Sequence, residues 1–459
     1  MTQEQRYSVR QNDAESSVMT KYIKRAEIYH ENDILESTLE LPGNKNTMYQ
    51  LFTDNQFHFE TLRTLGLARY SGSDVGEVLN AASKIKSGDF ESWYEAFYAL
   101  AERLNQHSKS IIDPIGLRDT LFRAATYYRM SDFFLHGNKK DPRILSLWRK
   151  QEECFDMALE LLDVPGERIN VQTEHGFYIP CILYRCSDDK KPRPTLILTN
   201  GYDGPQEELL HVFGFAALER GYNVITYEGP GQPSVVRYQG KGFIVEWEKV
   251  VTPVVTYFSN SSQFPEIDNK KIALLGYSFG GFLTPRAAAF EDRLAALITV
   301  DGVIDCFEAF SASIPAEAKL LLQSSDPSAK ATFDTQADLM LKNPHLPTGV
   351  KWGFEQGLWS FDVDSAYDYF QRVKPMNLLG GLAGKIECPT LVFDAEGEKY
   401  FVGAGGKSQP ERLREAIGEN ATLVKLTADD TAAEHCHVGA SVLMNQILFD
   451  WLGQVCGLF

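Results

Sequence analysis

A Gly-x-Ser-x-Gly pentapeptide between an apolar run and a helix-forming segment constrains the fold of this chain more than any other feature. The sequence GYSFG (276–280) follows the apolar run 271–275 and precedes the segment 281–284. A strand that turns directly into a helix needs small residues around the turning serine, because larger side chains would collide there. The pattern therefore predicts a sharp turn that presents the Ser278 hydroxyl at the carboxyl edge of a sheet, as a nucleophile.

Short apolar runs separated by turns or helical patterns predict the sheet itself. The runs are 168–172, 178–184, 195–199, 223–227, 271–275, 296–300, 390–393 and 422–426. The first two read as a hairpin that turns around His175-Gly176. Buried strands that alternate with helices are typical of a parallel sheet covered on both faces. We therefore predict an α/β fold with a mostly parallel, doubly wound sheet.

The 459 residues exceed one ordinary domain, and the hydrophobic period changes near Pro165. Upstream, apolar and aromatic residues recur at helical spacing, with helix starts at Asp89 and Asp113-Pro114, so we expect an all-helical domain over 1–164. The core then occupies 165–306 and 386–459. The gap at 307–385 is longer than one crossover needs, and it predicts a helical insertion over the sheet's carboxyl edge, which is a candidate lid.

Composition and charge restrict the partners. Apolar residues make up 44% and charged residues 23%, and the net charge is −17. This balance argues against nucleic acid or an anionic membrane as partner and favours a small-molecule substrate. No apolar stretch has the length of a membrane span, and the polar first residues lack a secretory signal, so we expect a cytoplasmic protein.

The seven cysteines are scattered without a CxxC pair, which predicts reduced thiols. His435-Cys436-His437 has the residue types of a metal site. Adjacent residues point in different directions, however, so we expect neither a metal nor a cofactor.

A serine becomes a nucleophile when a histidine takes its proton and a carboxylate orients that histidine. In sheets of this type the chain order is serine, acid, histidine. Three histidines follow Ser278: His345 falls in the insertion, and His435 and His437 follow the last predicted strand. We favour His435 as the base, with His437 as the alternative.

The acid is expected after the strand 390–393, where DAEGE (394–398) offers three carboxylates. Glu398 lies farthest past the strand end, where the loop turns towards the histidine, and is our first choice. Glu396 and Asp394 remain alternatives.

The developing oxyanion needs two backbone donors. Phe279 N–H, next to the nucleophile, is the first candidate. The second is Tyr202 N–H in NGYDG (200–204), which follows the strand 195–199.

Three further residues are candidate substrate contacts. Glu228 in YEGPGQ (227–232) and Asp305 in DGVID (301–305) follow strand ends, where such sheets bind ligands. His58 lies in a helical aromatic stripe, where simple packing competes with a role in the pocket.

Several of these motifs together resemble one branch of the α/β-hydrolases. The motifs are GYSFGG, NGYDG, YEGPGQ and EHCHVGA, joined upstream by GDFESW (88–93) and YYR (127–129). The branch contains the bacterial dihydroxypseudooxynicotine hydrolase, which cleaves a carbon–carbon bond beside a ketone, and fungal fusarin-type secondary-metabolite hydrolases. The resemblance covers most of the chain.

The resemblance implies Ser278 as nucleophile, His435 as base and Glu398 as acid, at a position where members usually have aspartate. It also implies that the N-terminal helical domain caps the active site and helps form a homodimer. The expected activity is serine-dependent hydrolysis of a small ketone- or ester-containing metabolite, at a carbon–carbon, ester or lactone bond. Asp305 would supply an extra acid for carbon–carbon cleavage. The alternative is a non-hydrolytic member that promotes cyclisation or acyl transfer of a polyketide-type substrate.

Overall fold

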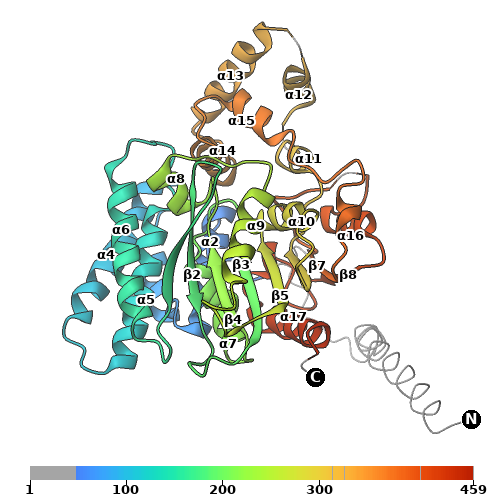
Figure 1. Cartoon of the computed structure of the whole chain (residues 1–459). Helices are drawn as coiled ribbons and strands as arrows, with labels where there is room; N and C mark the ends of the chain where they lie inside the picture. Colours follow the sequence, from blue (N-terminus) through green and yellow to red (C-terminus); the bar gives the residue numbers. More distant parts are fainter. Residues whose placement is uncertain (1–47, 313, 325, 404, 458–459) are drawn as a thin grey trace, which may run out of the picture. The chain divides into compact units, whose positions relative to one another are not determined.

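The computed structural model describes residues 48–457, except 313, 325 and 404. Residues 1–47, which are part of the predicted N-terminal helical region, lie outside the described residues. The described part contains an eight-stranded sheet with helices on both faces (Figure 1). The strands are β1 (Glu167–Gln172), β2 (Tyr178–Tyr184), β3 (Arg193–Thr199), β4 (Asn223–Tyr227), β5 (Ile267–Tyr277), β6 (Ala296–Val300), β7 (Thr390–Ala395) and β8 (Ala421–Leu426).

The sheet has the strand order β1-β2-β4-β3-β5-β6-β7-β8. β1 and β2 form an antiparallel hairpin, β2 pairs antiparallel with β4, and the remaining neighbours are parallel. The predicted mostly parallel sheet is confirmed, and each predicted apolar run lies in a strand. Because the carboxyl ends of parallel strands share one edge, the loops that follow β3 to β8 gather there.

Helices precede the sheet, as the helical spacing predicts. They are α2 (Asn55–Gly66), α3 (Val75–Ala82), α4 (Phe90–Ser108), α5 (Pro114–Asp132) and α6 (Pro142–Leu159). The predicted starts are correct: the Asp89 carboxylate accepts bonds from the first backbone N–H groups of α4, and Asp113 caps α5 ahead of Pro114. Among the described residues, no helix combines the length and the apolar character that crossing a membrane requires.

The two faces of the sheet belong to two apolar clusters. Leu196 and Leu198 of β3 pack in one cluster with α2 to α6, whereas Ile197 between them packs in the other. Alternate side chains of a strand point to opposite faces, which explains this division. α7 (Phe215–Leu218) and α17 (Ser441–Val455) join the first cluster, and α9 (Glu248–Phe258), α10 (Gly280–Ala288) and α16 (Gln409–Ile417) join the second. The N-terminal helices therefore share a core with one face of the sheet.

The predicted helical insertion lies between β6 and β7. It contains α11 (Cys306–Phe310), α12 (Ala316–Gln323), α13 (Ser328–Leu341), α14 (Thr348–Ser360) and α15 (Ala366–Val373). In Figure 1 this gold to orange segment extends beyond one end of the sheet. The first turn of α14 contacts the start of α2, where the Thr348 hydroxyl donates to the Asp54 carboxylate. The insertion is thus in direct contact with the N-terminal helices.

Candidate active site

Ser278 stands at the turn between β5 and α10. Its φ of 59° lies in the left-handed region, which a residue other than glycine seldom adopts. A Cβ added at Gly276 would lie 2.0 Å from the carbonyl oxygen of Gly280, so only glycine fits the tight turn. The strained turn presents the Ser278 side chain to the central cavity, as the pentapeptide predicts.

His435 lies within hydrogen-bond distance of the serine. The distance from Ser278 Oγ to His435 Nε2 is 2.8 Å. His437 is buried elsewhere, where its Nδ1 lies 2.7 Å from the carbonyl oxygen of Ala432 and its ring packs on Phe393. Of the two histidines that the sequence leaves open, the structure therefore brings His435 to the serine.

Glu398 is the one of the three candidate acids that contacts His435. Its Oε2 lies 2.5 Å from His435 Nδ1, and its Oε1 accepts bonds from Tyr400 N and Phe401 N. Glu396 instead accepts a bond from Ala428 N, and Asp394 binds the Ser408 hydroxyl. These two carboxylates stabilise neighbouring loops.

A second carboxylate, which the sequence analysis missed, reaches the same ring nitrogen. Asp301 Oδ2 lies 3.0 Å from His435 Nδ1 and also accepts the backbone N–H of Cys436. Asp301 directly follows β6 and has a φ of 60°, which turns its side chain back to the histidine. Its place at a strand end was the available signal, but in the same segment the sequence pointed to Asp305 instead.

The buried carboxylates set the charge balance at His435. Burial raises the pKa of Glu398, and the nearby Asp301 charge adds to this increase despite the opposing effect of His435. For Asp301, burial favours a higher pKa, but the hydrogen bond and charge of His435 prevail and lower it. Burial alone would lower the pKa of His435, yet its neighbours Cys436, Glu398 and Asp301 raise it well above its ordinary value. The site therefore favours the imidazolium form that arises when a serine proton is taken.

The loop after β3 packs against the serine turn. A Cβ added at Gly201 would lie 2.6 Å from Phe279 N and 3.0 Å from the Cβ of Ser278, so glycine permits this close approach. The Gln232 side chain holds the loop by donating to the carbonyl oxygens of Asn200 at 2.7 Å and Gly201 at 3.4 Å. The predicted oxyanion donors, Phe279 N–H and Tyr202 N–H, thus belong to adjoining segments.

Asp203, which follows Tyr202, is anchored by two arginines from the N-terminal helices. Its Oδ2 accepts bonds from Arg63 at 2.7 Å and Arg129 at 3.1 Å, and Arg129 also donates to its carbonyl oxygen at 2.9 Å. Arg63 makes a two-pronged contact with Glu208 as well, at 2.7 and 2.8 Å. The helices α2 and α5 therefore support the loop after β3.

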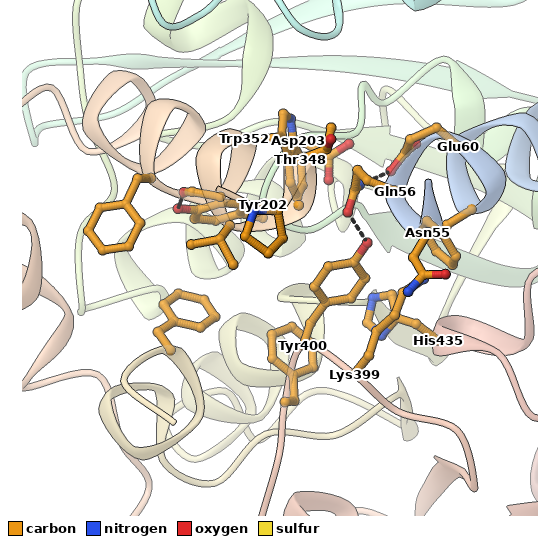
Figure 2. A pocket seen from close by; sticks show the side chains of 18 of the residues that line it. Asn55, Gln56, Glu60, Tyr202, Asp203, Thr348, Trp352, Lys399, Tyr400 and His435 are labelled. Atoms are coloured by element: carbon orange, nitrogen blue, oxygen red, sulfur yellow. Dashed lines mark hydrogen bonds between the residues drawn. The ribbon is translucent and has the colours of Figure 1, made fainter. Parts of the chain in front are cut away.

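A cavity of about 900 Å³ opens beside Ser278. Aromatic side chains supply much of its lining: Phe59, Tyr202, Phe310, Trp352, Tyr369, Phe370, Tyr400 and Phe401. Figure 2 shows one polar wall, where Tyr400 donates to the Gln56 amide oxygen and the Gln56 amide nitrogen donates to Glu60, each at 2.9 Å. Lys399 also lines the cavity, and burial lowers its pKa despite the Glu434 carboxylate nearby.

The three predicted substrate contacts lie outside this lining. Glu228 is buried, and its carboxylate accepts bonds from Gln206 N and Ser234 N. Asp305 caps α11 through Glu308 N, and His58 accepts a bond from Leu51 N. Each side chain is thus used to hold backbone in place, which corrects the expectation that it faces the substrate.

The face of α2 that lines the cavity is not the one that carries His58. Gln56, Phe59, Glu60 and Arg63 line the cavity at intervals of three and four residues, which is one face of a helix, whereas His58 points elsewhere. That spacing was visible in the sequence, but nothing in it marked α2 as a cavity wall.

Asp301, His435 and Cys436 together have the ligand types of a metal site. Asp301 lies at Nδ1 of the ring, whereas the Cys436 sulfur lies 3.4 Å from Nε2. One ring nitrogen of His435, an Asp301 oxygen and the Cys436 sulfur lie within 4.8 Å of one another, but Nε2 of the ring faces Ser278 Oγ and Nδ1 faces Glu398.

A mostly parallel sheet, a serine turn after β5 and a histidine after β8 define an α/β-hydrolase. Hydrolase LUC6 of Fusarium sp is 31% identical over an alignment of 422 residues that covers 90% of this chain and 99% of that protein. The 20-hydroxy-prefusarin hydrolase FUS2 of Gibberella moniliformis is also 31% identical, over 88% of this chain and 97% of its own. The chain therefore belongs to the branch of α/β-hydrolases that contains the fungal fusarin-type secondary-metabolite hydrolases.

A solved structure agrees on the fold. The 2,6-dihydroxy-pseudo-oxynicotine hydrolase matches with a TM-score of 0.63 and 20% identity, over 85% of this chain and 95% of its own. No protein-family model matches the chain. The family predicted from the sequence motifs is confirmed.

Proposed function

We propose that this hydrolase acts through Ser278 as nucleophile, His435 as base and Glu398 as the orienting acid. The observation that carries the proposal is the continuous contact from Ser278 Oγ to His435 Nε2 at 2.8 Å and from His435 Nδ1 to Glu398 at 2.5 Å. A serine, a histidine and a carboxylate in this arrangement can activate the hydroxyl without a cofactor.

In the ester or lactone reaction, Ser278 Oγ attacks the carbonyl carbon while its proton passes to His435 Nε2. The N–H groups of Phe279 and Tyr202 stabilise the charge that develops on the carbonyl oxygen. His435 then protonates the leaving oxygen, and an acyl group stays on Ser278. Water, activated by His435, attacks this acyl group and releases the acid product.

In the carbon–carbon reaction, the bond between the attacked carbonyl carbon and its neighbour breaks instead. The electron pair passes to that neighbouring carbon, where an adjacent ketone stabilises it, and a proton completes the second product. Glu60 lines the cavity with a carboxyl whose pKa burial raises to about 7. It takes the place that the sequence analysis gave to Asp305 as a source of this proton.

The substrate is inferred from the cavity and the relatives. A volume of about 900 Å³ and an aromatic lining suit a mainly apolar metabolite. FUS2 is described as a hydrolase of 20-hydroxy-prefusarin. We therefore infer a ketone- or ester-containing polyketide-type metabolite as substrate. The aromatic lining also supports the second candidate, transfer of the acyl group to a nucleophile within the substrate, because it limits access of water.

The first experiment is intact-mass analysis after treatment with a fluorophosphonate, in which Ser278 Oγ displaces fluoride from phosphorus. We expect a single adduct on the wild type, no adduct on Ser278→Ala and slow labelling of His435→Gln. His437→Gln is the matched control, because His437 lies in the same loop without contacting Ser278, and it should react like the wild type. An unlabelled wild type would contradict the proposal.

The homodimer implied by the resemblance stays a prediction. Light scattering coupled to gel filtration measures the mass in solution, and a monomer at micromolar concentration would contradict it.

A further inference from the structure

The helical insertion holds Tyr202, the proposed oxyanion donor, at three points. The Tyr202 hydroxyl donates to the carbonyl oxygen of Gly353 in α14 at 3.0 Å and lies 3.0 Å from the hydroxyl of Tyr369 in α15. Gln356 of α14 donates its amide N–H to the carbonyl oxygen of Tyr202, also at 3.0 Å. The side chain and the backbone of Tyr202 are therefore both bound to the insertion.

The contact from Gln356 is the one that acts on the backbone. A peptide carbonyl only accepts hydrogen bonds, so Gln356 must present its nitrogen to Tyr202 and its oxygen to the opposite side. There the oxygen accepts a bond from His136 Nδ1, at 2.6 Å. His136 stacks on Trp359, and both Gln356 and His136 are buried, so the amide has no second orientation that satisfies both partners.

His136 is held in turn. Its Nε2 lies 3.2 Å from the carboxylate of Asp132 at the end of α5, and Arg237 of α8 (Pro233–Gln239) contacts the same carboxylate. A buried hydrogen-bonded chain therefore runs from the N-terminal helices through His136 and Gln356 to the loop after β3. Gln356 and His136 each use both polar ends of the side chain in these contacts, which fixes their orientation.

Both peptide groups that flank the Cα of Tyr202 are consequently fixed. Gln232 donates to the carbonyl oxygen of Gly201 on one side, and Gln356 donates to the carbonyl oxygen of Tyr202 on the other. Because a peptide group is planar, the Gly201 carbonyl held by Gln232 sets the direction of the Tyr202 N–H. Gln356 fixes the next peptide group, which restrains the backbone rotation of Tyr202 on its other side. The residue that carries the proposed oxyanion donor is thus held in part by a side chain of the insertion.

We propose that Gln356 is a positioning residue for the oxyanion hole. The hole is then complete only when the insertion is docked on the loop after β3. The inference rests on the proposed serine hydrolase function. Gln356 touches neither the nucleophile nor the base, and it acts only through the Tyr202 backbone. Its loss should slow the chemical step and leave substrate binding in the cavity largely intact.

A pair of matched variants tests this role. Gln356→Glu keeps the shape and the acceptor for His136 but removes the donor to Tyr202. The control is Gln371→Glu in α15, which likewise removes a donor to a backbone carbonyl, that of Leu322 at 2.9 Å, away from the cavity. Gln356→Met, of similar volume and uncharged, covers the case in which a buried carboxylate prevents folding. Near-UV circular dichroism checks the fold of each variant.

The measurement is the saturation kinetics of Ser278 labelling by a fluorophosphonate, whose phosphoryl oxygen occupies the oxyanion hole. We expect the maximal rate of both Gln356 variants to fall about 100-fold, as for a misplacement of roughly 1 Å, with the half-saturating concentration within about twofold of wild type. Gln371→Glu should match the wild type.

Two results would overturn the inference. One is a maximal labelling rate equal to that of the wild type in folded Gln356 variants. The other is an increase in the half-saturating concentration that alone explains the slower labelling, which would indicate a change of cavity shape. Failure of the proposed function looks different, because then the wild type itself is not labelled at Ser278.

Discussion

At His435, two carboxylates face one ring nitrogen. Glu398 makes the shorter contact, at 2.5 Å, and Asp301 lies at 3.0 Å while also accepting the Cys436 N–H. Both sit where they can accept the same N–H, so either one can keep the ring in the tautomer that leaves Nε2 free for Ser278. The glutamate at position 398, where relatives were expected to carry aspartate, thus lies beside a second carboxylate.

The two acids should therefore substitute for each other in part. Loss of a sole orienting carboxylate costs about 10⁴-fold in kcat. We expect Glu398→Gln and Asp301→Asn each to cost about 10²-fold or less, and the double variant to lose the full amount. Hydrolysis of p-nitrophenyl esters, or the rate of fluorophosphonate labelling, measures this. If Glu398→Gln alone is as slow as the double variant, Asp301 has no orienting role.

The pH profile supplies an independent reading of the same variants. Cys436, Glu398 and Asp301 raise the pKa of His435 well above its ordinary value, so the protonated base should limit activity at a pH above about 6.5. Removing either carboxylate destabilises the protonated form of His435 and lowers its pKa. The acidic limb of the pH–rate profile then moves to lower pH. Glu396→Gln, at a carboxylate that binds Ala428 N instead, is the control and should leave the limb unchanged.

At the scale of elements, the sequence predicted the parts whose signals are local. The strands are continuous apolar runs, the helix starts at Asp89 and Asp113 are capping residues, and the serine turn needs its glycines. Asp301 and Gln356 escaped prediction for different reasons. Asp301 reaches His435 because of a left-handed φ, and Gln356 meets Tyr202 across 154 positions of sequence. Neither spacing nor composition carries that information.

Where α2 packs on the loop after β3, carboxyl groups outnumber guanidinium groups. Arg63 and Arg129 meet the carboxylates of Asp203 and Glu208, and Glu60 is a third carboxyl beside Arg63 at 3.3 Å. Two guanidinium charges balance two carboxylates, which leaves Glu60 as the surplus acid. Burial raises the pKa of Glu60 to about 7, against the attraction of Arg63.

This surplus predicts a pH-dependent stability. Between the unfolded pKa of about 4.3 and the folded pKa of about 7, the folded state keeps a proton that the unfolded state has lost. Stability therefore falls as pH rises through this window, and the cost remains above it. Glu60→Gln has no such titration, so the melting temperature of the variant minus that of the wild type should increase from pH 5 to pH 8. Exposed Glu95→Gln in α4 is the control, and an equal gain there would refute the assignment.

For the whole molecule, the way the apolar core is shared decides which parts of the chain can fold as independent domains. The helices α2 to α6 pack in the same cluster as one face of the sheet, including Leu196 and Leu198, and α2 also lines the cavity. An independent domain has a core of its own, whereas these helices cover apolar surface that the sheet would otherwise expose to water. The predicted boundary near Pro165 therefore marks a change of secondary structure within a shared core.

A chain that begins at residue 165 tests this directly. Without α2 to α6, the apolar face that contains Ile182, Leu196 and Leu198 meets water, and Asp203 loses both of its arginine partners. Because burial of apolar surface drives folding, we expect this fragment to aggregate, or to bind the dye ANS strongly and melt without a cooperative transition. Co-expression of residues 1–164 as a separate chain is the control, and it should restore a soluble complex and labelling of Ser278. A fragment that melts cooperatively, near the temperature of the full chain, would show instead that the sheet and its remaining helices fold as a unit of their own.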